Sequence, residues 1–245
     1  MPRSGSMWVF NILRQLLVKA SFLVIPENVP KSDQTMIELA KQGLVDPDPQ
    51  KKWVLKVHTH IKPDIPRSVF ITTYRDVRDA LVSWMRFMHS DFDTALKAAL
   101  SMTHTCDYYT SFPEDRSLKI DFYDIKLKPV EVVCRIARFL SLDIAENDIS
   151  TIVEGLTKER VKQMISDMDK KIQHRVEYGQ ALSKGELTGN LDGSVRGFDP
   201  QTGFQSGHVS SYNDGDWRMI LSGGEKKRMN DLLGPWLQQK GYLLD

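Results

Sequence analysis

Hydrophobic residues recur along this chain with two different periods, and their alternation predicts the order of its secondary structure. The first helical pattern places five apolar residues on one face, namely Trp8, Ile12, Leu13, Leu16 and Leu17. Further helical patterns cover residues 33–41, 76–89, 93–111, 129–142, 147–155, 158–172 and 216–241. Apolar and β-branched runs predict strands at residues 53–58, 68–74 and 117–122.

The alternation of strands with helices predicts an α/β fold with a central, mostly parallel sheet flanked by helices. The run at residues 68–74 supports this fold, because near-continuous apolar and β-branched sequence is typical of a buried parallel strand. Ligands of such sheets bind beyond the carboxyl ends of the strands. We therefore expect the turn at residues 2–6, His58, Arg75 and residues 122–123 to converge at one edge.

Residues 173–214 break the periodic pattern. This stretch is polar, carries seven glycines and shows little periodicity. A long loop inside a compact domain is usually a lid or a binding loop, or is disordered. We expect it to shape an acceptor pocket within a single domain that spans residues 1–245.

The chain opens on a turn with the chemistry of an anion site. Pro2, Arg3, Ser4, Gly5 and Ser6 lead directly into the first helix. The first backbone N–H groups of a helix lack intrahelical partners, and they attract anions when small residues allow close approach. A helix cap with no ligand explains the same residues. The sequence G-x-x-x-x-G-K-[ST] of a Walker A loop does not occur.

The overall composition argues for a local anion site and against a broadly charged surface. Lys and Arg total 33 and Asp and Glu total 32, so the net charge is +1. This balance gives no reason to expect nucleic acid or an anionic membrane as a partner. No apolar run reaches membrane-spanning length, and Cys106 and Cys134 do not suggest a disulfide framework. We expect a cytoplasmic protein.

Two further segments carry candidate chemistry at the ends of predicted strands. Arg75 ends one strand, and Ser83 follows two helical turns later. A guanidinium fork meets two phosphate oxygens at once, although surface ion pairs would explain the same segment. Lys56 and His58 end another strand, and a histidine there titrates in the range of a general base. A structural histidine is the plain alternative, and His60 is a rival base.

These segments resemble the sulfotransferases in sequence and in order. Residues 2–8 (PRSGSMW) resemble the family loop PKSGTTW/PRSGTTW, residues 74–83 resemble YRNPRDxxVS, and residues 56–58 (KVH) resemble KTH. The resemblance is to the soluble, bacterial-like enzymes that act on small molecules. It implies a P-loop-like three-layer fold and 3′-phosphoadenosine-5′-phosphosulfate (PAPS) as cosubstrate, with adenosine 3′,5′-bisphosphate as product and no metal.

The resemblance also implies the roles of individual residues. The 5′ end of the nucleotide would contact Arg3, Ser4, Gly5, Ser6, Met7 and Trp8. Arg75 and Ser83 would hold the 3′-phosphate. His58 would be the catalytic base, with Lys56 and Arg3 stabilising charge on the transferred group. We prefer His58 to His60 because of its offset from Lys56.

Weaker matches extend the resemblance toward the C-terminus. Residues 121–126 (DFYDIK) look like YEDLK, so Phe122 or Tyr123 would contact the cofactor. Residues 215–218 (GDWR) look like GDWK, which brings Trp217 and Arg218 toward the nucleotide. A basic RKG element precedes this segment in the animal enzymes, whereas this chain has residues 210–212 (SSY) there. Arg218 or His208 would have to replace that contact.

Two departures from the family keep other functions open. Met7 stands where the family usually has a hydroxyl residue, and only Met1 precedes a loop that in the family follows a buried strand. We expect sulfuryl transfer to a hydroxyl or amine of a small-molecule acceptor. The alternatives are a nucleotide-binding protein with a decayed active site and a P-loop-type phosphotransferase. The acceptor and the oligomeric state stay open.

Overall fold

The computed structural model describes residues 1–45, 48–61, 66–209 and 212–244. Its strands are β1 (Leu23–Ile25), β2 (Lys51–Trp53), β3 (Phe70–Tyr74), β4 (Ser117–Asp121), β5 (Leu187–Gly189) and β6 (Val195–Gly197). Its first helices are α1 (Ser6–Lys19), α2 (Asp33–Val45), α3 (Val77–Met88), α4 (Phe92–Thr110) and α5 (Phe122–Leu127). The later helices are α6 (Pro129–Phe139), α7 (Glu146–Gly155), α8 (Lys158–Glu177), α9 (Trp217–Ile220) and α10 (Gly223–Gln239), with a 3₁₀ turn at residues 184–186.

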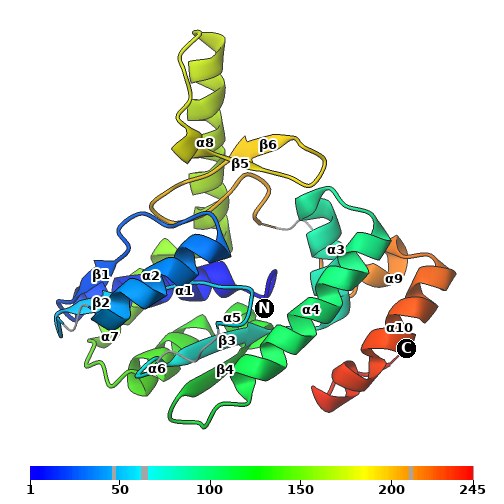
Figure 1. Cartoon of the computed structure of the whole chain (residues 1–245), viewed down its shortest axis with the longest axis horizontal. Coiled ribbons are helices and arrows are strands. Elements are labelled where there is room, and N and C mark those ends of the chain that lie inside the picture. The colour runs from blue at the N-terminus through cyan, green and yellow to red at the C-terminus, as the bar shows by residue number, and fades with distance from the viewer. Residues whose placement is uncertain (46–47, 62–65, 210–211, 245) are drawn as a thin grey trace.

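The structure confirms the α/β class, and its parallel strands come in pairs. β3 and β4 run parallel, with Phe70 opposite Ser117 and Tyr74 opposite Asp121. β1 and β2 form a second parallel pair, and β5 and β6 form an antiparallel hairpin. In Figure 1 the first two pairs occupy the middle and one end of the molecule, and the hairpin lies above them.

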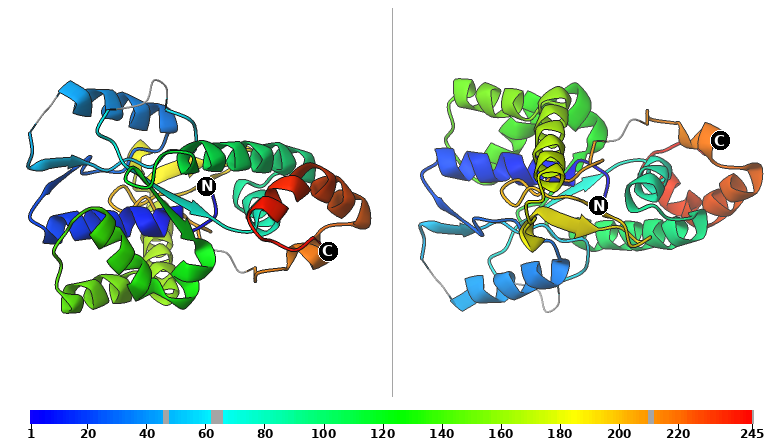
Figure 2. Two further views of the ribbon diagram at one scale, coloured as in Figure 1. Left: turned by 90° about the horizontal axis from the view of Figure 1, so that it is seen from below. Right: turned by 90° about the horizontal axis from the view of Figure 1, so that it is seen from above.

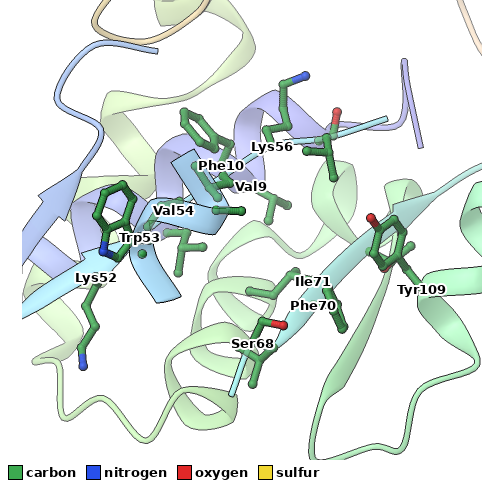
Figure 3. Close-up of a pocket in the computed structure, with 18 of the residues that line it drawn as sticks. Val9, Phe10, Lys52, Trp53, Val54, Lys56, Ser68, Phe70, Ile71 and Tyr109 are labelled. Atoms are coloured by element: carbon green, nitrogen blue, oxygen red, sulfur yellow. The ribbon is translucent and has the colours of Figure 1, made fainter. Parts of the chain in front are cut away.

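The single central sheet that the sequence predicts is divided into two pairs in the described residues. A cavity of about 740 Å³ lies between the pairs, lined by residues 51–57 on one side and 66–73 on the other. Trp53, Val54, Phe70 and Ile71 line this cavity together with Phe10 of α1 (Figure 3). Of the strand predicted at 53–58, only Trp53 lies in a described strand, at the end of β2, and residues 54–57 continue as irregular backbone.

Helices cover both faces of the β3–β4 pair. α1, α6 and α7 lie on one side and α4 on the other, where it packs against α3 and α10 (Figure 2). Each side has its own apolar core. One core is centred on α1 and α6, with Ile12, Leu16 and Ile136 fully buried, and the other on α3, α4 and α10, with Leu81 and Leu237 fully buried.

Other differences from the sequence prediction concern short or glycine-rich segments. β1 has three residues, which is too short for a periodic signal. α2 continues past Gly43, and α10 continues through Gly234 and Pro235. The region predicted as one long loop at 173–214 begins as the last turn of α8 and includes the β5–β6 hairpin. Among the described helices, none combines the length and apolarity needed to cross a bilayer.

Candidate active site

The turn before α1 is held in a conformation that exposes backbone N–H groups. Arg3 has φ 60°, and Gly5 has φ 81° as the residue that precedes α1. A Cβ on Gly5 would lie 2.8 Å from Ile125 and 3.3 Å from Phe122, so both conformation and space require glycine there. No side chain caps α1, and the first intrahelical bond runs from Val9 N to Gly5 O at 3.0 Å. The earlier N–H groups are therefore available to an anion.

Ser4 fixes this turn to the end of β3. Its side chain is fully buried, and its Oγ lies 2.7 Å from Oγ1 of Thr73 and 2.5 Å from the carbonyl oxygen of Met1. The hydroxyl is thus engaged inside the protein. What Ser4 offers to a ligand in this arrangement is its backbone.

Arg3 is a half-buried cation whose partners in the described residues are neutral. Its Nε donates to Oγ of Ser83 at 3.0 Å, and its Nη2 donates to the carbonyl of His208 at 3.0 Å. Its guanidinium lies 4.2 Å from the ring centroid of Phe87. Burial, reinforced by the charges of nearby arginines, lowers the pKa of Arg3 to about 9. A cation in this position gains stability when an anion binds.

Lys56 and His58 form a second cationic element. Lys56 Nζ lies 2.7 Å from His58 Nε2, so the ammonium donates to a neutral imidazole that carries its proton on Nδ1. His58 Nδ1 is buried without a hydrogen-bond partner in the described structure. The backbone N–H of His58 donates to Oδ2 of Asp33 at 2.6 Å, which fixes the position of the residue.

The pKa values of this pair follow from burial and from the neighbouring positive charges. Burial lowers the pKa of Lys56 to about 8, although Asp33 opposes the shift. Burial also lowers the pKa of His58 well below its usual range, and Lys56 adds to that effect. At neutral pH the imidazole is therefore uncharged and can accept a proton, while the ammonium keeps its charge.

Arg3, Lys56 and His58 line one cavity of about 390 Å³. Ser6 and Met7 of α1 contribute to the same wall. The rest of the lining is largely aromatic and basic, with Trp84, Phe87, Phe198, Arg196 and His208. Three of its polar atoms are buried without a hydrogen-bond partner in the described structure: His208 Nδ1, Gln205 Oε1 and Arg196 Nε. Such atoms favour a polar ligand, because an unmet buried hydrogen-bonding group costs free energy.

The glycine-rich stretch after α8 contributes Arg196, Phe198 and His208 to this lining, and α3 contributes Trp84 and Phe87. Asn11 of α1 donates to the carbonyl of Thr202 at 3.0 Å and so ties this stretch to the first helix. Gly203 has φ 70°, and a Cβ there would lie 2.3 Å from the terminal methyl of Met7. Met7, which departs from the family pattern, therefore packs beneath the stretch that closes the cavity.

Arg75 lies at the carboxyl end of β3, beside the turn. Its Nη1 donates to the carbonyl of Arg3 at 3.2 Å, and its guanidinium lies 4.4 Å from the ring centroid of Phe122. Its Nη2 lies 2.8 Å from Oδ1 of Asp214 and 3.6 Å from Oδ2 of Asp79. The predicted convergence of the turn, Arg75 and residue 122 is confirmed. Unlike Arg3, Arg75 already has carboxylate partners.

The remaining predicted residues are more dispersed. Trp8 Nε1 donates to the carbonyl of Leu156 at 3.0 Å, which ties α1 to the end of α7. Trp217 is 2% exposed in the core, and Arg218 stacks on its outer side with Cζ 4.5 Å from the ring centroid. None of these three residues lines the cavity of about 390 Å³, and the same is true of Arg75, Ser83, Phe122 and Tyr123.

The sequence analysis left His60 as an alternative base and His208 as an alternative to the missing RKG contact. His60 stacks on Tyr108, with ring centroids 4.3 Å apart, whereas His58 lines the cavity. His208 lies on the cavity wall beside Phe87, at a centroid distance of 5.4 Å. Ser210 and Ser211, which stand where the animal enzymes have their basic element, lie outside the described residues.

Sequence reasoning missed several residues of this site. Asp33, Phe87, Lys126 and Asp214 reach the site from segments far apart in the chain. Lys126 ends the segment 121–126 that the sequence analysis compared with YEDLK, but no role was assigned to it, and the other three belong to none of the motifs compared. Arg196 lies in the glycine-rich stretch, where no motif marks it, and its guanidinium lies 3.8 Å from the ring centroid of Phe87.

These cations and the neutral imidazole are suited to the transfer of a group from an anionic donor. The family described as "Sulfotransferase domain" matches residues 1–189. The chain belongs to the sulfotransferase family, whose members transfer a sulfuryl group from PAPS and release adenosine 3′,5′-bisphosphate. No curated protein matches the sequence.

Solved structures with the same fold include sulfotransferases at low sequence identity. Mouse sulfotransferase SULT7A1 complexed with PAP is 12% identical, with a TM-score of 0.63 over 97% of this chain and 81% of that one. Retinol dehydratase in complex with androsterone and inactive cofactor PAP is 15% identical, with a TM-score of 0.52 over 96% of this chain and 78% of that one. A complex of retinol dehydratase with retinol and PAP is also 15% identical, with a TM-score of 0.50.

Proposed function

We propose that this sulfotransferase acts on a small-molecule acceptor bound in the cavity of about 390 Å³, with His58 as the general base. The observation that carries the proposal is the junction of the Lys56–His58 pair with the Arg3 turn in one cavity. The cosubstrate supplies the sulfuryl group. The residues of this chain bind the donor, neutralise its charge and remove the proton of the acceptor.

The 5′ end of the donor fits the turn at residues 2–5 and the first N–H groups of α1. The uncapped helix terminus and the positive φ of Gly5 support this assignment, because such an end binds phosphate through backbone N–H groups. Arg3 and Lys56 supply positive charge beside it. Groups of this kind stabilise charge that develops during transfer, and loss of one donor typically costs about 10²–10³ in rate.

His58 takes the proton of the acceptor nucleophile. Its low pKa keeps the imidazole neutral at physiological pH, and it lines the cavity beside Arg3 and Lys56. In the resting protein Lys56 donates to His58 Nε2. We infer that the ammonium turns to the sulfuryl oxygens when the donor binds, which frees Nε2 to accept a proton.

The acceptor lies against the aromatic part of the cavity lining. Phe87, Trp84 and Phe198 offer apolar surface, and Gln205 and His208 offer hydrogen-bonding atoms that are unpartnered in the described structure. This lining suits a compact acceptor with a flat apolar part and a polar substituent. Retinol dehydratase, which has the same fold, is in complex with androsterone in one structure and with retinol in another. Both are mostly apolar molecules.

The test is turnover of PAPS against a panel of hydroxyl and amine acceptors, read by mass spectrometry for the sulfonated product. The wild-type protein should form product and adenosine 3′,5′-bisphosphate in equal amounts. His58→Ala should lower kcat by about 10²–10⁴ without a comparable loss of nucleotide binding. His60→Ala is the matched control and should retain activity. Nucleotide binding with no product from any acceptor would contradict the proposal and favour a binding protein.

A further inference from the structure

The carboxylate of Asp214 lies between two cations at the carboxyl end of β3. Its Oδ1 accepts from Arg75 Nη2 at 2.8 Å, and its Oδ2 accepts from Lys126 Nζ. Each oxygen therefore has its own charged donor. Two cations held on either side of one small anion are also what a phosphate group requires, because charge-assisted hydrogen bonds to separate oxygens are strong and directional.

Arg75 is fixed on its other sides, so the space beside its Nη2 is defined by the fold. Its face lies on Phe122, and its Nη1 donates to the carbonyl of Arg3. Asp79 faces the same Nη2 at 3.6 Å from within α3, and its pKa is raised to about 6, chiefly by burial. The cluster of Arg75, Lys126, Asp79 and Asp214 contains as many cations as carboxylates.

Lys126 belongs to a rigid part of the site, although its own side chain is partly exposed. It lies on α5, which begins where the Asp121 carboxylate caps Tyr123 N at 2.8 Å. Ile125 on the same helix is buried, and it meets Gly5 of the turn. The side chain of Lys126 is 46% exposed, so its ammonium can turn toward a new partner while the helix stays in place.

Asp214 can leave without unfolding of its segment. The backbone on either side is anchored, because Gly215 N donates to Asp79 Oδ1 at 2.8 Å and Asn213 N donates to Asp216 Oδ2 at 2.7 Å. The Asp214 side chain is 22% exposed, so a rotation of this side chain alone can move the carboxylate to solvent. The anion between the two cations is therefore exchangeable.

We propose that Lys126 is a second ligand of the 3′-phosphate of the nucleotide, and that Asp214 occupies the place of this phosphate in the free protein. The inference rests on the proposed function and on the role that the family resemblance implies for Arg75, which is to bind the same phosphate. Lys126 then supplies the positive charge that in the animal enzymes comes from the basic RKG element before the GDWK segment. Asp214 is an internal competitor, and the bound nucleotide exchanges a carboxylate for a phosphate of higher charge.

The proposal makes opposite predictions for the two members of one ion pair. Lys126→Gln removes a phosphate ligand, so it should weaken binding of adenosine 3′,5′-bisphosphate about tenfold, as expected for a lost charge-assisted hydrogen bond. Asp214→Asn removes the competitor, so it should tighten the same binding severalfold, because the fraction of protein able to bind increases. A purely structural ion pair predicts that both substitutions weaken binding.

The experiment is isothermal titration calorimetry of each variant with adenosine 3′,5′-bisphosphate and, in parallel, with adenosine 5′-monophosphate. The monophosphate lacks the 3′ group, so neither substitution should change its affinity more than about twofold. Lys126→Arg keeps the charge and should retain most of the affinity. Lys128→Gln is the matched control, because Lys128 pairs with Glu131 at 3.5 Å on the same segment. Thermal unfolding of each variant confirms that it is folded.

The outcomes separate this inference from the function on which it rests. Opposite shifts for Lys126→Gln and Asp214→Asn, confined to the 3′-phosphorylated nucleotide, support the inference. Parallel losses, or equal losses for both nucleotides, overturn it and leave the proposed function intact. A wild-type protein that does not bind adenosine 3′,5′-bisphosphate contradicts the proposed function and the inference together.

Discussion

The two ends of the proposed nucleotide site differ in how their cations are neutralised. At the turn before α1, Arg3 and Lys56 have neutral partners, namely a hydroxyl, a carbonyl and an imidazole. At the end of β3, Arg75 has carboxylate partners in Asp214 and Asp79. Both regions lie within one continuous structure, because the carbonyl of Arg3 accepts from Arg75.

This difference assigns separate tasks to the two ends. Arg3 and Lys56, which pair with neutral groups, have lowered pKa values, so a bound anion stabilises their charged forms most. This suits the end of the site where charge develops during transfer. Neutralised cations are stable without a ligand, and they select only an anion that outcompetes the internal carboxylate. The 3′ end should therefore govern nucleotide specificity, and the 5′ end should govern the rate.

The largest effect is expected from Arg3→Ala. This change removes a cation that has no carboxylate partner among the described residues, so kcat should fall by about 10²–10³ while binding of the product nucleotide changes less. Steady-state kinetics with PAPS measures the rate. Arg14→Ala is the control, because Arg14 lies on α1 and donates only to backbone carbonyls of residues 26 and 27. A rate loss no greater than that of the control would contradict the proposal that the 5′ end governs the rate.

Arg75→Lys should have the next largest effect, and it should act on binding. The lysine keeps a positive charge near Asp214 and Asp79 but loses the guanidinium fork, so affinity for adenosine 3′,5′-bisphosphate should fall about tenfold. Affinity for adenosine 5′-monophosphate should be almost unchanged, as measured by calorimetry. Equal losses for the two nucleotides would show that the β3 end does not read the 3′-phosphate.

Gly5→Ala should destabilise the fold at the junction of the two regions. The positive φ of Gly5 costs an alanine about 1–2 kcal/mol, and the approach to Ile125 adds a packing cost of about 1–3 kcal/mol. Gly193 is a matched control, because its φ of 82° is similar and no atom lies within 4 Å of an added Cβ. Thermal unfolding should therefore show a greater loss for Gly5→Ala than for Gly193→Ala. Equal losses would mean that the turn is not packed tightly on α5.

The smallest effect is a pH dependence that belongs to the 5′ end. The Lys56 ammonium has a pKa of about 8, so its charge is present below that pH and is lost as the pH rises through it. The pKa of His58 is well below its usual range, so the base stays neutral at pH 7. Turnover should therefore decline as the pH rises past about 8. Lys56→Arg should move this decline to higher pH, and an unmoved decline would assign it to another group.

The sequence predicted the elements that have strong local patterns. α1, α3, α4 and β3 follow from periodic or continuous apolar runs, because burial of one face imposes that period. The turn and Arg75 were also found, since each joins a strand end or a helix start to residues with obvious anion chemistry. Their meeting in space follows from the rule that parallel strands end at one edge.

The rest depends on contacts between distant segments. The division of the sheet into two parallel pairs leaves no mark in the local pattern of residues 53–58, because apolar residues line a cavity as readily as they fill a strand. Likewise, Asp214 and Lys126 are 88 positions apart, and only the fold brings them to Arg75. Burial is equally hidden from the motif, because Trp217, a conspicuous motif residue, is buried in the core.

A crystal structure of the complex with adenosine 3′,5′-bisphosphate tests the central claim most directly. The account predicts one nucleotide spanning both regions, with its 5′-phosphate on the N–H groups at the start of α1 and its 3′-phosphate between Arg75 and Lys126. Asp214 should have turned to solvent. A nucleotide bound elsewhere, or one whose two phosphates both lie away from the turn and from Arg75, would contradict it.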